Sequence, residues 1–354
     1  GDVVLQCNER DKQYFKYSHL DRLAKGALRR NRKNNSRQIE ERSRQMAGQI
    51  QTLQEMINQV VKGKQKVVEK VLCAMLAGGH ILLEDIPGVG KTTLAMAIAK
   101  ATDLTYRRVQ FTPDVLPSDL VGFSMYNEKT KEFEYREGAV FANLFLADEI
   151  NRTSPKTQSA LLEAMEEEKV TVDGITHNLP APFTVIATEN PIGSSGTQML
   201  PESQLDRFMI CLSMGYPEHQ DAVDILKNNG AKSLSGIQAV VTLAEWKKLQ
   251  NMAEESYVSE EMYDYIVRLT ENTRKHPMVR LGASPRASLA LLRMAKAMAV
   301  MKGRDYVTPE NVMDIYQEVL AHRIKLNMQA KAQGLEVSDI LKQVFEGTKV
   351  VCVE

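Results

Sequence analysis

The chain contains a short glycine-rich segment whose residue types suit phosphate binding. Residues Gly88 to Thr93 read Gly-Val-Gly-Lys-Thr-Thr and follow an apolar run at residues 81–83. Backbone N–H groups at the start of a helix form a cradle for an anion, and the helix dipole adds positive potential there. In such a loop Lys91 reaches the terminal phosphates and the Thr92 hydroxyl ligates Mg²⁺. The segment therefore predicts a P-loop that binds a nucleoside triphosphate with Mg²⁺.

One position departs from the usual P-loop pattern. Glycine is expected five positions before Gly90, and Asp85 stands there. Asp tolerates left-handed backbone better than most residues, so the loop can still form. The competing interpretation is an ordinary turn between a strand and a helix, and the Gly-Lys-Thr-Thr sequence in this context argues against it. The cofactor-binding residues predicted here are Asp85, Pro87, Gly88, Val89, Gly90, Lys91, Thr92 and Thr93.

Two acidic residues and an amide follow apolar runs farther along the chain. Asp148 and Glu149 end the run at 144–147, and Asn190 comes shortly after the run at 184–187. Because ligands of a parallel sheet bind at the carboxyl ends of its strands, these side chains are expected near the phosphates. Asp148 would hold Mg²⁺, Glu149 would polarise the attacking water, and Asn190 would bind that water or the γ-phosphate. A turn-capping role before a proline is the alternative for Asn190.

Two arginines are candidates for contacts with the triphosphate. An arginine supplied by a neighbouring subunit can raise a phosphoryl-transfer rate by about 10³–10⁵-fold. Arg207 follows a short predicted helix and is the candidate for this role. An ion pair with Asp206 or another nearby acid is the competing interpretation. Arg286 begins a predicted helix in the second half of the chain and would report the γ-phosphate.

Alternating strands and helices between about residues 39 and 217 predict a parallel α/β sheet. An amphipathic helix is expected from Ile39 to Val60, because apolar residues recur there every three or four positions. Two hairpins are expected near 123–135 and 170–176, the second with Asp-Gly at its turn. A strand is expected from Ile81 to the glycine-rich turn, and further strands at 106–111, 144–147, 183–187 and 208–212.

The sequence changes character after about Pro217. Residues 243–327 are rich in Ala, Met, Leu and Glu and predict helices, with Ser259, Ser284 and Thr308 as N-caps. We therefore expect three parts. They are a basic, flexible extension at 1–38, an α/β nucleotide-binding core at 39–217 and an all-helical domain at 218–354.

Composition and charge exclude several classes of protein. The 43% hydrophobic and 25% charged residues are typical of a globular protein, and no apolar window has the length of a membrane span. Neither a secretory leader nor a Cys-x-x-Cys pair is evident, so we expect a cytoplasmic protein with reduced thiols. Lys and Arg balance Asp and Glu at 45 each, but residues 22–44 hold nine basic and two acidic residues. This arm could bind nucleic acid or anionic lipid, although a solvated tail is favoured because no aromatics interleave.

Taken together, these segments resemble the MoxR family of AAA+ ATPases, in the clade with a helix-2 insert and a hairpin before the sensor-1 strand. The resemblance covers roughly residues 55–330. The matching segments are Leu83–Thr93, Phe111–Asp119, Leu146–Arg152, Leu161–Glu167, Val185–Pro191, Leu200–Phe208 and Gly282–Ala287.

The resemblance implies a role for individual residues. Val61 and Gly63 would line the adenine, and Arg152 is a rival of Arg207 for the role in trans. The two hairpins match the inserts of the family, which often face a central pore or a client. The implied assignments are Walker A at Lys91 and Thr92, Walker B at Asp148 and Glu149, sensor 1 at Asn190, the arginine finger at Arg207 and sensor 2 at Arg286.

The resemblance also implies a function. It predicts a homo-oligomeric ring, a hexamer, that hydrolyses ATP with Mg²⁺ and remodels or assembles client proteins. The implied partner carries a von Willebrand factor A domain, and the C-terminal helices would form the lid of the AAA+ fold. Two alternatives stay open: a DNA-acting AAA+ motor that uses the basic arm, and a nucleotide-gated scaffold with little turnover. The acidic balance outside the arm argues against the first, and the presence of Glu149, Asn190 and Arg207 argues against the second.

Overall fold

The computed structural model describes residues 36–85, 88–190, 200–227, 234 and 236–349. These residues form two compact units. The first, here called the sheet unit, comprises Gln49–Asn251 and Glu318–Arg323. The second, here called the helical unit, comprises the described part of Gly1–Gly48 with Met252–Gln317 and the described residues from Ile324 onward. The domain limits predicted at residues 38 and 217 stay predictions.

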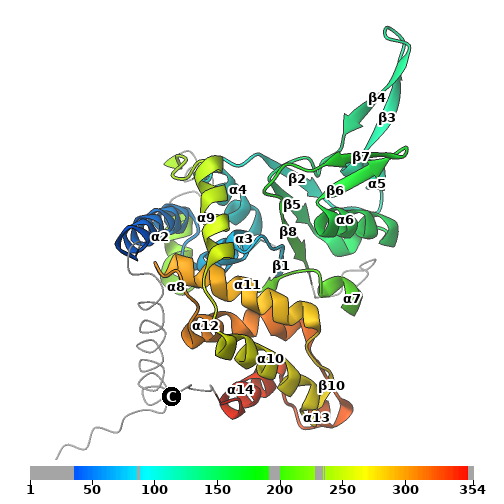
Figure 1. Ribbon diagram of the computed structural model, residues 1–354. Coiled ribbons are helices and arrows are strands. Elements are labelled where there is room, and N and C mark those ends of the chain that lie inside the picture. The colour runs from blue at the N-terminus through cyan, green and yellow to red at the C-terminus, as the bar shows by residue number, and fades with distance from the viewer. Residues whose placement is uncertain (1–35, 86–87, 191–199, 228–233, 235, 350–354) are drawn as a thin grey trace, which may run out of the picture. The chain divides into compact units, whose positions relative to one another are not determined.

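A five-stranded parallel sheet forms the centre of the sheet unit, in the order β2-β5-β8-β1-β9 (Figure 1). Strands β5 and β8 are buried along their whole length, because helices cover both faces of the sheet. The predicted parallel α/β fold is confirmed. The strands are β1 (Ile81–Glu84), β2 (Tyr106–Gln110), β5 (Leu144–Asp148), β8 (Thr184–Glu189) and β9 (Ile210–Leu212).

Helices α3 and α4 lie on one side of the sheet and α6 lies on the other (Figure 1). Leu161 of α6 packs with Phe145 and Val185 of the sheet in one apolar core. Ile50 and Ile57 of the predicted amphipathic helix are buried, as their spacing indicates. Helices α2 and α9 are shared between the units, since α2 begins and α9 ends in the helical unit. The helices of the sheet unit are α2 (Ser36–Val60), α3 (Gln65–Leu76), α4 (Lys91–Ala101), α5 (Pro117–Val121), η1 (Ile150–Arg152), α6 (Pro155–Glu167), α7 (Glu202–Leu205), α8 (His219–Lys227), α9 (Leu243–Glu255) and η3 (Ala321–Arg323).

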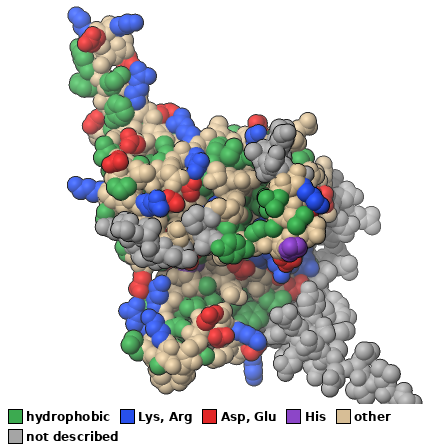
Figure 2. All heavy atoms as spheres, turned by 180° about the vertical axis from the view of Figure 1, so that it is seen from behind, with side chains coloured by type: hydrophobic (Ala, Val, Ile, Leu, Met, Phe, Trp, Pro, Cys, Tyr) green, Lys and Arg blue, Asp and Glu red, His purple; other side chains and the backbone are tan. Residues whose placement is uncertain are grey.

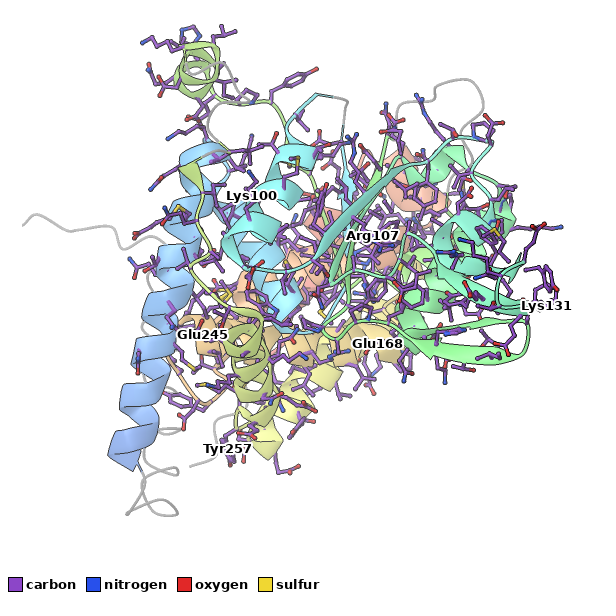
Figure 3. The ribbon with its side chains drawn as sticks, turned by 90° about the horizontal axis from the view of Figure 1, so that it is seen from above. Lys100, Arg107, Lys131, Glu168, Glu245 and Tyr257 are labelled. Atoms are coloured by element: carbon purple, nitrogen blue, oxygen red, sulfur yellow. The ribbon has the colours of Figure 1, made fainter. Side chains whose placement is uncertain are left out.

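Both predicted hairpins are present in the sheet unit. The first pairs β3 (Gly122–Asn127) with β4 (Glu132–Glu137) and projects from the sheet, with Lys131 at its tip (Figures 1 and 3). The second pairs β6 (Lys169–Val172) with β7 (Ile175–Asn178). Its turn residues Asp173 and Gly174 have φ of 50° and 80°, as a tight hairpin turn requires.

An aromatic contact joins the two hairpins. The ring of Tyr135 on β4 stacks on that of His177 on β7, with centroids 3.8 Å apart and planes 13° from parallel. The Tyr135 hydroxyl also donates to the Val121 carbonyl at the base of the first hairpin. Apolar side chains are exposed farther out on the first hairpin, among them Phe133 at 74% (Figure 2).

The helical unit contains α10 to α14 and a small antiparallel sheet. Ser259 and Ser284 accept hydrogen bonds from the N–H groups of Met262 and Ala287, which confirms both predicted N-caps. The Thr308 hydroxyl instead donates to Asn311 Oδ1 at 3.0 Å. The remaining elements are α10 (Glu260–Lys275), β10 (Val279–Leu281), α11 (Pro285–Met301), α12 (Pro309–Leu320, its last residues in the sheet unit), β11 (Lys325–Leu326), α13 (Met328–Ala332) and α14 (Val337–Gly347).

Strands β10 and β11 correct the prediction that every element of this region is helical. They have only three and two residues, too few for an alternating pattern to be visible in the sequence. Across the described ranges, none of the helices combines the length and the hydropathy needed to cross a membrane.

Candidate nucleotide site

The predicted P-loop connects β1 to α4. Gly88 and Gly90 have φ of 85° and 96°, in a region that favours glycine, so both glycines of the motif are required by the backbone. Lys91 is the first residue of α4, and its Nζ donates to the Asp85 carbonyl at 2.7 Å. Pro87, also predicted at this site, lies outside the described residues.

Lys91 is the cation of the P-loop itself, and its side chain is buried. Desolvation by burial lowers the pKa of Lys91 below its ordinary value, while the nearby carboxylates of Asp85, Asp148 and Glu149 act in the opposite direction. A buried ammonium group near several carboxylates is suited to receive the negative charge of a triphosphate.

Asp85 uses its side chain for a purpose that the sequence did not indicate. Its Oδ2 accepts hydrogen bonds from the N–H groups of Met214 (2.5 Å) and Gly215 (2.7 Å) and from the Ser213 hydroxyl (3.2 Å). The carboxylate therefore ties the start of the P-loop to the turn that follows β9. The aspartate that departs from the P-loop pattern therefore makes side-chain hydrogen bonds that a glycine could not make.

The two acidic residues stand at the end of β5, beside β8. Asp148 Oδ1 accepts from the Thr188 hydroxyl at 2.7 Å, and that hydroxyl oxygen accepts from the Glu149 N–H at 2.8 Å. Glu149 has φ of 60°, which is uncommon for a residue with a side chain. A strained backbone at the end of a central strand is consistent with a functional position.

Sequence reasoning missed two residues of β2 that contact these acids. Arg108 Nη2 forms an ion pair with Asp148 Oδ2 at 2.7 Å, and Gln110 Nε2 donates to Glu149 Oε2 at 2.8 Å. Arg152 Nε also lies 3.1 Å from Glu149 Oε2. The sequence shows two polar residues, Arg108 and Gln110, on the same face of a predicted strand. It does not show that this strand pairs with β5, which is what brings both side chains to the acids.

Asn190 follows the end of β8, whose last residue Glu189 pairs in register with Glu84 of β1. This register brings Asn190 to the carboxyl edge of the sheet, beside the start of the P-loop. The Asn190 carbonyl accepts a hydrogen bond from Asn151 Nδ2 at 3.2 Å, so the backbone here is linked to the segment after Glu149.

The arginine candidates have different surroundings. Arg207 Nη2 lies 3.3 Å from Glu166 Oε2 of α6, with both side chains about one-third exposed. Asp206, the first partner considered for Arg207, instead binds Arg323 at 2.8 Å. Arg286 lies in the first turn of α11, in the helical unit.

The predicted adenine-lining residues lie between α2 and α3. Val61 is buried and continues the hydrogen bonding of α2 through its N–H. Gly63 has φ of 68°, and a Cβ at this position would lie 2.0 Å from Asp221 Oδ2. Lys64 Nζ donates to the Tyr216 carbonyl at 2.8 Å, so this turn is linked to the same segment that Asp85 holds.

The residues present suit Mg²⁺ and a triphosphate. The Thr92 hydroxyl and the Asp148 carboxylate are oxygen donors, which Mg²⁺ prefers. Asp148 is buried and is oriented by the Thr188 hydroxyl. Gly88 and Gly90 have the positive φ that lets a glycine backbone approach an anion closely.

Comparison with known proteins agrees with this geometry. Residues 80–210 match the profile of the family described as "ATPase family associated with various cellular activities (AAA)", and residues 271–344 match "AAA lid domain". The chain is 46% identical over 297 residues to the uncharacterized protein YeaC of Bacillus subtilis, covering 84% of this chain and 93% of that protein. It is 37% identical over 313 residues to chaperone MoxR1 of Mycobacterium tuberculosis, covering 85% and 83%. A putative ATPase of Cytophaga hutchinsonii has a similar structure, with a TM-score of 0.83, 36% identity and coverage of 90% and 99%.

Proposed function

Because the chain belongs to the MoxR family of AAA+ ATPases, we propose that it hydrolyses ATP in a ring of identical subunits to remodel or assemble a client protein. That the protein is an ATPase of the MoxR chaperone type follows from the family; the ring, the client and the residue roles are our proposal.

The observation that carries the proposal is the order of the central strands. Strands β5, β8 and β1 are neighbours in one parallel sheet, so Glu149, Asn190 and Lys91 follow adjacent strand ends. Ligands of such sheets bind at this edge. This strand order supports a role for all three side chains at one phosphate site.

We assign the steps of hydrolysis as follows. Lys91 and the N–H groups of the loop bind the phosphates, and Val61 and Gly63 contact the adenine. Glu149 accepts a proton from the attacking water, which Asn190 orients. Thr92 and Asp148 would hold Mg²⁺, which would neutralise charge on the phosphates. Arg286 binds the γ-phosphate from the lid.

We propose Arg207, rather than Arg152, as the arginine that acts on the neighbouring subunit. Arg152 is 3.1 Å from the Glu149 carboxylate of its own chain, which favours a local role. The pair between Arg207 and Glu166 is about one-third exposed, so water screens it and a phosphate can displace it. Action in trans makes hydrolysis depend on assembly, and a hexameric ring is the arrangement that the resemblance implies.

We propose the projecting β3–β4 hairpin as the contact with a client or with a partner that carries a von Willebrand factor A domain. Tyr126 is 49% exposed and Phe133 is 74% exposed, and their rings form an edge contact on one face of the hairpin. Exposed aromatic side chains in one place are typical of protein-binding surfaces.

Two substitutions test the assignment. Glu149→Gln removes the carboxylate that polarises water and should keep ATP binding while abolishing turnover. Lys91→Ala should lose ATP binding. Binding is measured with a fluorescent ATP analogue and turnover by phosphate release. Brisk hydrolysis by the first variant, or unchanged affinity in the second, would overturn the site. Affinity capture with Glu149→Gln in ATP should then identify the client and the partner.

The two alternatives are separated by the same measurements. A nucleotide-gated scaffold would bind ATP with no measurable turnover in the unmodified protein. A DNA-acting motor would show hydrolysis stimulated by DNA, with binding that weakens steeply as salt rises. The basic residues that motivated the DNA-acting alternative lie mostly before residue 36, outside the described residues.

A further inference from the structure

Arg323 is a buried arginine to which the site described above gives no role. It ends η3, and residues 318–323 belong to the sheet unit although the chain on both sides belongs to the helical unit. Its side chain is only 2% exposed. Burying a guanidinium group is costly unless its donors are bound, so the contacts of Arg323 indicate what it holds in place.

Arg323 binds the short segment that follows α7. Its Nε donates to Asp206 Oδ1 at 2.8 Å. Its Nη2 donates to the carbonyls of Phe208 (2.6 Å) and Asp206 (3.2 Å), and its Nη1 donates to those of Met209 (3.2 Å) and Val319. A planar guanidinium with five N–H donors can make this set of contacts, whereas an ammonium group cannot.

The bound segment carries Arg207. Asp206 precedes Arg207 and Phe208 follows it, and the backbone of both is bound by Arg323. His322 of η3 also contacts the Phe208 carbonyl, at 3.2 Å. The backbone at Arg207 is thus held on both sides by buried hydrogen bonds.

The side chain of Arg207 is held much less firmly than its backbone. Its ion pair with Glu166 is partly exposed and is screened by water. A residue that must leave one partner and reach a phosphate on another subunit needs this combination. A fixed backbone sets where the guanidinium arrives, and a weak pair lets it go.

We infer that Arg323 is a positioning residue for ATP hydrolysis on the neighbouring subunit, because it fixes the backbone that presents Arg207. The inference rests on the proposed action of Arg207 in trans. Arg323 is not among the residues that we propose to bind ATP or the attacking water. Its loss should therefore leave the ATP site of its own subunit intact and impair the site of the next subunit.

The test is a complementation experiment with Arg323→Met. We expect a fluorescent ATP analogue to bind as in the unmodified protein, while kcat falls about 10²-fold, because small misplacements of a reacting group have effects of this size. Mixing with Glu149→Gln subunits should restore turnover. Those subunits cannot hydrolyse ATP themselves but supply a well-placed Arg207 to the intact sites of the variant.

Control variants make each outcome decisive. Arg207→Ala should behave like Arg323→Met, alone and in the mixture. Arg304→Met removes an ion pair with Glu310 in the helical unit and should leave kcat unchanged. If Arg323→Met fails to fold, Asp206→Asn is used instead, because it weakens the contact between Arg323 and Asp206 without removing it. This variant is then mixed with Glu149→Gln subunits in the same way.

The outcomes separate the two hypotheses. Normal turnover by Arg323→Met and Asp206→Asn would overturn the positioning role alone. The same conclusion would follow if Glu149→Gln subunits restored turnover to Arg207→Ala but not to Arg323→Met and Asp206→Asn. If Arg207→Ala itself is not rescued, action in trans is wrong and the role of Arg323 fails with it.

Discussion

Asp85→Gly would complete the glycine pattern of the P-loop, yet we expect it to destabilise the protein and weaken ATP binding. The Asp85 carboxylate accepts from the N–H groups of Met214 and Gly215, and Met214 is buried. Glycine would leave the Met214 N–H without this acceptor. It would also release the turn after β9 from the start of the P-loop.

The size of the effect follows from these contacts. A hydrogen bond to a charged group contributes about 1.5–3 kcal/mol, which applies to the buried Met214 N–H. The bond from Gly215, which is half-buried and can be replaced by water, contributes ~1 kcal/mol. The added backbone freedom of glycine costs about 0.5–1 kcal/mol more. We therefore expect the free energy of unfolding to fall by about 3–5 kcal/mol, and by roughly half as much for Asp85→Asn, which keeps an acceptor.

The assay is urea unfolding followed by circular dichroism, together with titration of a fluorescent ATP analogue. Asp103→Gly is the matched control. Asp103 is exposed and has φ of 49°, so glycine relieves strain there and stability should stay the same or rise. If Asp85→Gly unfolds at the same urea concentration as the unmodified protein and binds ATP equally well, the carboxylate does not tie the P-loop to the turn after β9.

Three further predictions concern charged side chains, two at the site and one at the start of α9. Arg108→Met removes the cation that pairs with Asp148 Oδ2 and would compete there with Mg²⁺. If this ion pair contributes ~1 kcal/mol, the Mg²⁺ concentration for half-maximal ATPase activity should fall roughly fivefold. A rise in that concentration would contradict the competition. Burial lowers the pKa of Lys91, so ATP affinity should fall as pH rises through that lowered pKa, while the weak binding of Lys91→Ala should not change over the same range. The pKa of Glu245 is lowered mainly by a hydrogen bond from the Thr242 N–H, so its stabilisation of α9 is present above its ordinary pKa and is lost as pH falls through the lowered one. Thermal unfolding should therefore find Glu245→Gln less stable than the unmodified protein at pH 7, with a difference that disappears in acid.

Local pattern was sufficient to predict most of the elements. The apolar runs at 144–147 and 184–187 are buried strands, and Asp173-Gly174 is a hairpin turn, because these features depend on neighbours within a few residues. The predicted caps at Ser259 and Ser284 also depend only on the next turn of helix.

The contacts that complete the site depend on residues far apart in the chain. Arg108 meets Asp148 because β2 pairs with β5, and Arg323 meets Asp206 across 117 positions. No periodicity carries such information. Asp85 is a second example. Its residue type indicated only that it tolerates a left-handed backbone, whereas the N–H groups that its carboxylate binds are about 130 positions away in the sequence.

The stacked rings of Tyr135 and His177 have a consequence for the evolution and engineering of this protein. They join two hairpins that are separate insertions in the sequence, and a single substitution on either side removes the stack. A chimera whose exchanged hairpin lacks its ring would lose this stack, whereas one that receives both hairpins keeps the pairing of its donor. The two insertions are therefore best exchanged as one cassette.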